Sequence, residues 1–221
     1  MSKKTMKPGT MLAPLPAVMV SCGEGENANI ITIAWTGIVN SEPPMTYVSV
    51  QPRRHSHHLI EESGEFVINL VPKDLSFEMD YCGCVSGSKE DKFAAMKLTK
   101  EAADIVKCPL IGESPLNLEC KVVEKKTLGS HDMFLAEIVA VHVDESLFDD
   151  NDKIRLEKAG LVALVHGGYY AVGGTRTGRM GYSVMKPKTK KRLTREGRQP
   201  GGRKPQKRGS GPKKEEKGSK D

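Results

Sequence analysis

Two arginines stand where a predicted strand gives way to a predicted helix, and together they favour an anion. The segment 49–56 reads SVQPRRHS and contains Arg53 and Arg54. We expect a helix over 56–63 with Ser56 as its N-cap. Unpaired N–H groups at a helix N-terminus and arginine side chains both bind phosphate well. The segment therefore predicts a phosphate site, with an ordinary capped basic turn as the alternative.

A second segment, 29–39, combines the only tryptophan of the chain with small hydroxyl and glycine residues. Trp35 lies at the end of an expected strand and is followed by Thr36 and Gly37. A backbone and hydroxyl edge beside an aromatic ring suits the rim of a flat aromatic ligand. The alternative is a tryptophan that fills the open end of a barrel.

A third segment, 80–93, is a loop of small residues followed by a short helical pattern. Glycine and serine in such a loop let the backbone approach a ligand closely. The helix that we expect over 88–96 would project Lys92 toward the same ligand. The alternative is an ordinary loop with a solvated lysine.

The sequence lacks the common signatures of nucleotide binding and hydrolysis. It contains no G-x-G-x-x-G after a strand, no P-loop and no G-x-S-x-G. His55, His57 and His58 form an H-x-H-H cluster, but adjacent helical residues face different directions and do not reach one ion easily. We therefore expect helix-surface histidines and predict no metal site.

Strand signals dominate the elements that must position these segments. β-branched runs bounded by turn residues predict strands over 18–22, 30–34, 46–50, 66–71, 116–123, 134–143 and 160–165. Helical patterns predict helices over 56–63, 76–81 and 88–96, and a single turn over 154–158. In the strand 116–123, Glu119 and Lys121 alternate with apolar residues, which predicts one wet face. We infer a mainly β fold, a closed antiparallel β-barrel with short helices in its connections.

The positive charge of the chain is concentrated at its C-terminal end. Residues 186–221 hold 15 Lys and Arg against 4 Asp and Glu, whereas residues 1–185 hold 19 against 24. The net charge of +6 therefore describes the tail, and the body is mildly acidic. We divide the chain into a folded domain, 1–185, and a disordered Lys/Arg-rich tail, 186–221. The tail is either a solvated extension or a loose contact for nucleic acid or anionic lipid.

The cysteines and the N-terminus favour a cytoplasmic protein. Five cysteines without regular spacing form neither a disulfide framework nor a zinc site. The apolar run 11–20 is short and interrupted by Pro14 and Pro16, so we expect no secretion signal but a first strand over 18–22. No stretch approaches the roughly 20 apolar residues that span a bilayer. A reducing compartment fits these features.

With these segments in view, the chain resembles the flavoredoxin-type branch of the flavin reductase-like family, the FMN-binding split barrels. The resemblance covers about residues 14–181 and leaves the basic tail out. The order and spacing of the matching motifs support the resemblance more strongly than any single motif does. The matching words are TIAWTG at 32–37, NSEPP at 40–44, GEFVINL at 64–70, DYCG at 80–83, DKF at 91–93, NLEC at 117–120 and GSHDMF at 129–134.

This resemblance implies a six-stranded split barrel that forms a homodimer, with one FMN per subunit near the interface. His131 matches the histidine that the family places near the flavin face or the nicotinamide, and it is the candidate catalytic residue. Ser130 stands where typical NAD(P)H:flavin reductases have an aspartate. The way in which those reductases bind the nicotinamide is therefore not implied for this chain. The implied isoalloxazine and ribityl contacts are Asn29, Trp35 and Thr36; the ribityl and phosphate contacts are Ser49, Val50, Gln51, Arg53, Ser56 and His57; and the closing side is Cys84, Val85, Ser86, Gly87 and Lys92.

The implied activity is that of an FMN-dependent oxidoreductase. It would pass electrons from NAD(P)H or a redox protein to flavin, ferric iron or a protein acceptor, with the protein supplying orientation and charge. Two alternatives stay open: a non-enzymatic FMN electron carrier, and a nucleic-acid- or surface-binding protein that acts through its basic tail. Cys82 and Cys84 are either small packing residues or a thiol relay.

Overall fold

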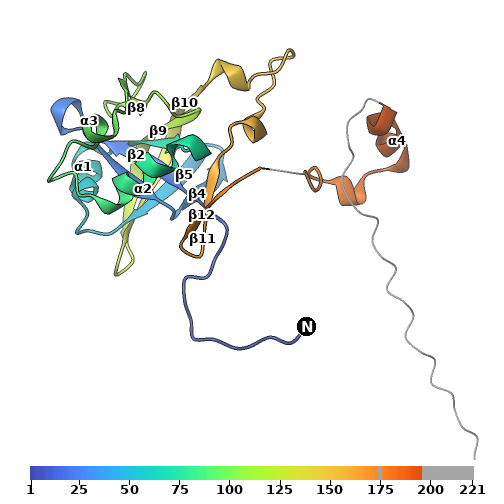
Figure 1. Cartoon of the computed structure of the whole chain (residues 1–221), viewed down its shortest axis with the longest axis horizontal. Helices are drawn as coiled ribbons and strands as arrows, with labels where there is room; N and C mark the ends of the chain where they lie inside the picture. The colour runs from blue at the N-terminus through green and yellow to red at the C-terminus, as the bar shows by residue number, and fades with distance from the viewer. Residues whose placement is uncertain (174–175, 196–221) are drawn as a thin grey trace, which may run out of the picture. The chain divides into compact units, whose positions relative to one another are not determined.

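The computed structural model describes residues 1–173 and 176–195. It divides into two units, Met1–Gly173 and Gly174–Asp221, each of which is described by itself (Figure 1). The helices of the first unit are α1 (His55–Ser63), α2 (Ser76–Cys84) and α3 (Lys92–Met96), with 3-10 turns η1 (Gly25–Asn27), η2 (Lys73–Leu75), η3 (Glu145–Leu147) and η4 (Leu156–Lys158). Its strands are β1 (Leu15–Pro16), β2 (Val18–Cys22), β3 (Asn29–Ile33), β4 (Thr36–Ser41), β5 (Pro44–Val50), β6 (Glu65–Leu70), β7 (Lys100–Glu101), β8 (Leu110–Ile111), β9 (Leu116–Thr127), β10 (Asp132–Val143), β11 (Val162–Val165) and β12 (Gly168–Ala171).

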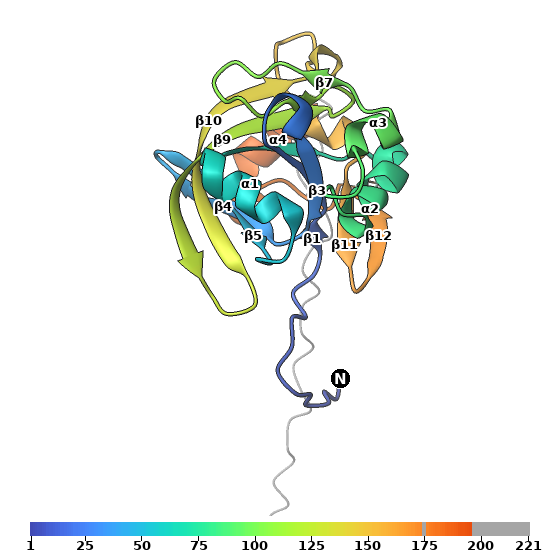
Figure 2. The ribbon, with the colours of Figure 1, turned by 90° about the vertical axis from the view of Figure 1, so that its left-hand side faces the viewer.

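The main sheet has seven strands and closes into a barrel. Its order is β3-β2-β6-β9-β10-β5-β4, and all its pairings are antiparallel. β3 and β4 stand at opposite ends of this order, yet only Ala34 and Trp35 separate them in the chain. So short a link spans at most about 11 Å, so the sheet must curl until its edges approach each other. Figure 2 shows β9 and β10 wrapping around this curve. The mainly β barrel that the strand pattern predicts is confirmed.

The centre of the main sheet is buried on both faces. Every residue of β2 is buried. Val20 belongs to the cluster that fills the barrel, together with Phe66 and Phe134. Met19, which points to the opposite face, belongs to a second cluster with Met79 of α2. Helices α2 and α3 thus cover the outer face beside β3, on the right of Figure 2.

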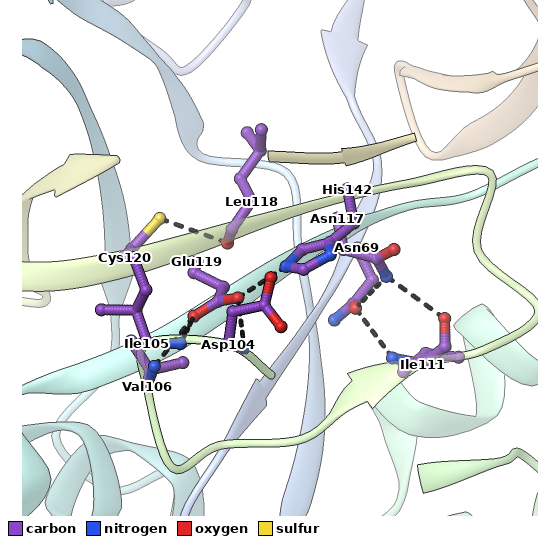
Figure 3. A network of polar contacts seen from close by, with 10 residues as sticks. All are labelled: Asn69, Asp104, Ile105, Val106, Ile111, Asn117, Leu118, Glu119, Cys120 and His142. Carbon is purple, nitrogen blue, oxygen red and sulfur yellow. Dashed lines mark hydrogen bonds and ion pairs between the residues drawn. The ribbon is translucent and has the colours of Figure 1, made fainter. Parts of the chain in front are cut away.

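Strand β9 corrects our expectation of one wet face. Glu119 is fully buried. Its carboxylate accepts the N–H groups of Asp104, Ile105 and Val106, each at 2.8 Å. Nε2 of His142 lies 2.6 Å from the same carboxylate (Figure 3). A buried charge is tolerated when it is paired and hydrogen-bonded, and strand alternation does not show that a distant loop covers this side.

Helix α1 begins one residue before the expected start, and Ser56 is not its N-cap. Arg54 occupies the cap position with an extended backbone and makes no side-chain capping bond. The Ser56 hydroxyl is instead turned to Asn29, whose Nδ2 donates to Oγ at 2.7 Å. The helix ends as predicted, because Gly64 takes the left-handed conformation with φ 67°.

The other two helices also differ from the predicted ranges. Helix α3 starts at Lys92 rather than Ser88, because the Asp91 carboxylate caps it by accepting the N–H groups of Phe93 at 2.9 Å and Ala94 at 3.2 Å. Helix α2 continues beyond the expected end at residue 81 as far as Cys84. The two cysteines of the third segment therefore lie on a helix and not in a loop.

Five strands escaped prediction: the two-residue strands β1, β7 and β8, and the longer strands β4 and β12. β4 contains turn-forming residues. It pairs with β5 along its length, from Thr36 opposite Val48 to Ser41 opposite Pro44. β12 pairs with β11 across the tight turn at Gly167. In β4, Gly37 and Asn40 have low strand propensity, and the pairing with β5 holds them in an extended conformation.

The second unit contains η5 (Tyr182–Val184) and α4 (Pro187–Arg195) among its described residues. We expected a disordered tail from residue 186, and α4 contradicts this over its own span. Pro187 at the first helical position and the following Lys and Arg residues are compatible with a helix, and Leu193 is buried. Residues 196–221 lie outside the described part of the chain, and the domain division after residue 185 stays a prediction. In the described residues, no helix has both the length and the apolar character to cross a bilayer.

Candidate functional site

Two neighbouring cavities run along β3 to the start of α1. They share Ile31 and Arg54 in their linings, and their volumes are about 200 and 160 Å³. We call the larger one the helix-end cavity and the smaller one the tryptophan cavity. Asn29, Ile31, Arg53, Arg54, His55, Ser56, Cys82, Cys84, Val85, Ser86, Gly87 and Lys92 line the helix-end cavity. Ile31, Thr32, Ile33, Ala34, Trp35, Ser49, Val50, Gln51, Arg54 and His131 line the tryptophan cavity.

The helix-end cavity is built to hold an anion. The first N–H groups of a helix lack the usual intrahelical partners, and α1 has no side-chain cap for them. The His57 N–H donates to the Arg54 carbonyl at 2.9 Å, so the N–H groups of the residues before it are the ones that face a ligand. Two arginines flank these groups. Arg53 Nε donates to Gln51 Oε1 at 2.7 Å, and Arg54 Nη1 donates to the Gly83 carbonyl at 3.2 Å, so both side chains are held in place. Helix dipole, N–H donors and guanidinium groups all favour negative charge here.

Ser56 and Asn29 meet at the wall of this cavity, although the sequence separates them widely. Because Ser56 Oγ accepts a hydrogen bond from Asn29, its own hydroxyl hydrogen remains available to a second acceptor. Gly87 lies against Asn29 so closely that a Cβ on it would come within 2.1 Å of Asn29 Oδ1. A glycine at position 87 therefore allows the loop after α2 to pack closely against Asn29 of β3, and this contact forms part of the cavity wall.

Lys92 lines the helix-end cavity as a buried residue, not as a projecting one. It is only 3% exposed, and its Nζ donates to the carbonyls of Ile30 and Cys82, both at 2.7 Å. Burial lowers its pKa, and the neighbouring cysteines Cys82 and Cys22 oppose that shift. Lys92 thus fastens α3 to β3 and α2 while bringing positive charge to the cavity.

The tryptophan cavity has an aromatic wall. The rings of Trp35 and His131 lie 4.4 Å apart between centroids, tilted by 40°. Ser130 Oγ and His131 Nδ1 are hydrogen-bonded at 2.9 Å, which orients the imidazole. Strand β5 ends beside these rings and contributes Ser49 and Val50. This cavity suits the edge of a flat ring system.

The structure brings all the predicted site residues to one of the two cavities except Thr36 and His57. Thr36 Oγ1 donates to the Tyr47 carbonyl, so the hydroxyl is used within the β4–β5 hairpin. His57 is buried, and its Nε2 lies 2.8 Å from Asp132 Oδ2. Neither side chain lines a cavity, although each directly adjoins a residue that does.

Sequence reasoning named both Arg53 and Arg54 as candidates for anion binding, but the resemblance assigned only Arg53 to the site. Arg54 lines both cavities, and the sequence alone did not show which arginine faces where. Sequence reasoning also missed Ile31, which lines both cavities. His55 was set aside with the histidine cluster, and its ring instead packs edge-on against that of His58, 4.8 Å away.

The cysteines at the helix-end cavity differ in their environment. All five cysteines of the chain are free; Cys82 is buried and Cys84 is exposed. Burial raises the pKa of Cys82 to about 11, which keeps it a neutral thiol near neutral pH. A protonated Cys82 thiol does not support the thiol relay that we considered for Cys82 and Cys84.

A polar cluster also occurs away from the two cavities. Asp104, Glu119 and His142 place oxygen and nitrogen atoms within 4.8 Å of one another. Both carboxylate oxygens of Glu119 already accept backbone N–H groups, so the arrangement caps the loop before β8 (Figure 3). Packing and hydrogen bonding account for this cluster, and we assign no ion to it.

Comparison with known proteins connects this geometry to a family. The family described as "Flavin reductase like domain" matches residues 11–172. A protein of Archaeoglobus fulgidus is 33% identical over 143 residues, which cover 65% of this chain and 80% of that protein.

Solved structures show the same architecture. Flavoredoxin of Desulfovibrio vulgaris (Miyazaki F) superposes with a TM-score of 0.75 at 32% identity, covering 81% of this chain and 98% of that chain. Flavoredoxin from Methanosarcina acetivorans gives 0.73 at 28% identity, covering 83% and 100%. The match spans the barrel and both cavities, and the chain belongs to the flavin reductase-like family.

Proposed function

We propose that this chain binds FMN in the two joined cavities and acts as an FMN-dependent oxidoreductase. The observation that carries the proposal is the shape and charge of the site. A donor-rich, cationic cavity at the start of α1 adjoins a cavity with an aromatic wall, and Arg54 and Ile31 line both. A ligand with a phosphate at one end and a flat ring at the other matches this pair.

The residues of the helix-end cavity fit the phosphate group. Arg53, the Ser56 hydroxyl and the first N–H groups of α1 supply donors, and no carboxylate lines this cavity among the described residues. Charge-assisted hydrogen bonds of this kind are stronger than neutral ones. Asn29 fixes the Ser56 oxygen, and Gly87 keeps Asn29 in place.

The residues of the tryptophan cavity orient and enclose the ring. When bound, FMN supplies electron- and hydride-transfer chemistry that no protein side chain provides. Trp35, which is 37% exposed, lines the cavity with an aromatic side chain, and Ser49 and Val50 at the end of β5 line it as well. His131, oriented by Ser130, holds an imidazole against this wall where it can donate or accept a proton.

The proposed reaction takes electrons from NAD(P)H or a redox protein to flavin, ferric iron or a protein acceptor. The similarity to two flavoredoxins supports it. We also propose a homodimer, supported by the edge strand β4, on which Ile38 is 69% and Val39 51% exposed. Free cysteines support a reducing compartment, the cytoplasm.

A visible absorbance spectrum of the purified protein tests the proposal. We expect an oxidised-flavin band, release of FMN on denaturation, and a stoichiometry of one FMN per chain. A colourless protein that stays colourless after incubation with FMN would refute it. Anaerobic stopped-flow mixing with NADH or NADPH then separates an enzyme from a pure electron carrier, since only the enzyme loses the flavin band without a protein donor.

A further inference from the structure

The described part of the second unit is rich in basic side chains. Its described residues, 176–195, include eight Lys and Arg and no Asp or Glu. Helix α4 alone holds five of these cations, and all five are exposed. We call this set the α4 basic surface. Its members are Lys188, Lys190, Lys191, Arg192 and Arg195.

The spacing of these residues concentrates positive charge on the helix. Lys188 and Arg192 are four residues apart, as are Lys191 and Arg195, so each pair lies on one helix face. Four of the cations line a hollow of about 440 Å³ together with Thr189. A polyanion placed there would meet several positive side chains at once.

We propose that the α4 basic surface binds the sugar–phosphate backbone of a nucleic acid. Lys188 to Arg195 rise about 10 Å along the helix, which matches about three phosphates along one strand of a duplex. The contact requires no base readout and is therefore sequence-independent. The surface lies outside the flavin reductase-like domain match at 11–172, so this activity is separate from the proposed redox function.

The composition of α4 favours nucleic acid over a lipid bilayer. A helix that lies in a membrane interface needs an apolar face beside its basic one. Leu193 is the only aliphatic or aromatic residue of α4, and it is buried within the described structure. Residues 1–185 are net acidic, with 19 Lys and Arg against 24 Asp and Glu, so the body offers a nucleic acid no comparable attraction.

The test compares full-length proteins that differ only in four charges. One variant carries Lys188→Gln, Lys191→Gln, Arg192→Gln and Arg195→Gln, because glutamine keeps helix propensity while removing charge. Fluorescence anisotropy is measured with a labelled 20-nucleotide single-stranded RNA and a 20-base-pair DNA duplex over a series of salt concentrations. Vesicles of phosphatidylcholine with 30% phosphatidylserine form the third arm. The matched control neutralises four exposed lysines of the body, Lys73, Lys89, Lys126 and Lys153, in the same way.

We expect the wild-type protein and the body control to bind RNA or DNA with a steep salt dependence. The α4 variant should bind at least tenfold more weakly at low salt, and its log–log salt slope should be smaller by about 3, from roughly 0.7 to 0.9 per phosphate contact. Equal binding by the α4 variant and the wild type overturns the proposal. Binding to the vesicles without binding to either nucleic acid overturns it as well. Flavin content of each protein is measured in parallel, so a failure of the flavin site is recognised separately.

Discussion

His57 of α1 and Asp132 of β10 form a buried pair, with Nε2 and Oδ2 2.8 Å apart. His57 follows Ser56, which lines the helix-end cavity, and Asp132 follows His131, which lines the tryptophan cavity. The His57 ring also packs edge-on against Phe134, with centroids 5.1 Å apart. The pair therefore fixes α1 relative to the start of β10, which directly follows His131.

Replacing Asp132 with alanine should destabilise the fold and disturb the site. His57 would be left buried without its partner, which costs about 1–3 kcal/mol in the free energy of unfolding. Denaturant unfolding followed by the fluorescence of Trp35 measures this loss. The control is Glu61→Ala, because Glu61 also faces His57, at 3.7 Å, but is exposed, and should cost less than about 1 kcal/mol. A loss for Glu61→Ala as large as that for Asp132→Ala would contradict the buried pair's role.

Arg53→Ala and Ser56→Ala should each weaken FMN binding while leaving riboflavin binding nearly unchanged. Riboflavin has no phosphate, so it does not use the donors of the helix-end cavity. Loss of one charge-assisted hydrogen bond costs about 1.5–3 kcal/mol, or roughly 10- to 150-fold in Kd. Quenching of flavin fluorescence measures both affinities. Equal losses for the two flavins would show that our phosphate assignment is wrong.

Gly87→Ala should lower flavin retention, because its Cβ would meet Asn29 Oδ1 at 2.1 Å and displace the side chain that holds Ser56. We expect a purified protein with less than half of the wild-type flavin content, an order-of-magnitude expectation for overpacking that costs about 1–3 kcal/mol. Gly173→Ala is the matched control, since a Cβ there meets nothing within 4 Å. If the Gly87 variant kept the wild-type flavin content, the close contact between Gly87 and Asn29 would not be needed for flavin binding.

Cys84 should react with a thiol reagent long before Cys82 does. Cys84 is exposed, whereas burial raises the pKa of Cys82 to about 11 and keeps its thiol protonated. Mass spectrometry of the protein after brief treatment with iodoacetamide at pH 8 identifies the modified residue. Because Cys84 lines the helix-end cavity, bound FMN should slow its modification severalfold. Labelling of Cys84 that is equally fast with and without FMN would place the ligand elsewhere.

Glu119 should give the fold a stability that acid removes. Burial opposes its ionisation, but the bonds from His142 and from three backbone N–H groups outweigh burial and lower the pKa of Glu119 below the ordinary 4.5. A carboxyl with a lower pKa in the folded state stabilises the fold above its unfolded pKa, and this contribution disappears as the pH falls through the folded pKa. The difference in unfolding free energy between the wild type and Glu119→Gln should thus be constant at neutral pH and shrink in acid. Urea unfolding at a series of pH values measures this difference. A difference that grows in acid would contradict a lowered pKa for Glu119.

The sequence by itself determined most strands of the main sheet and the family of this protein. Alternation and β-branched runs place the main strands, and Gly64 marks the end of α1, because these signals depend on neighbours in the chain. The three segments with unusual chemistry were visible for the same reason. Their order and spacing were enough to show the resemblance that the match over 11–172 establishes.

Only the tertiary structure decided which side chains meet. Closure of the barrel brings Asn29 to Ser56, and the covering of β3 by α2 and α3 buries Lys92 against two backbone carbonyls. A covering loop likewise turns Glu119 from an expected surface residue into a buried cap. Local patterns report how a residue alternates along its own strand or helix, whereas burial and hydrogen-bond partners depend on segments many residues away.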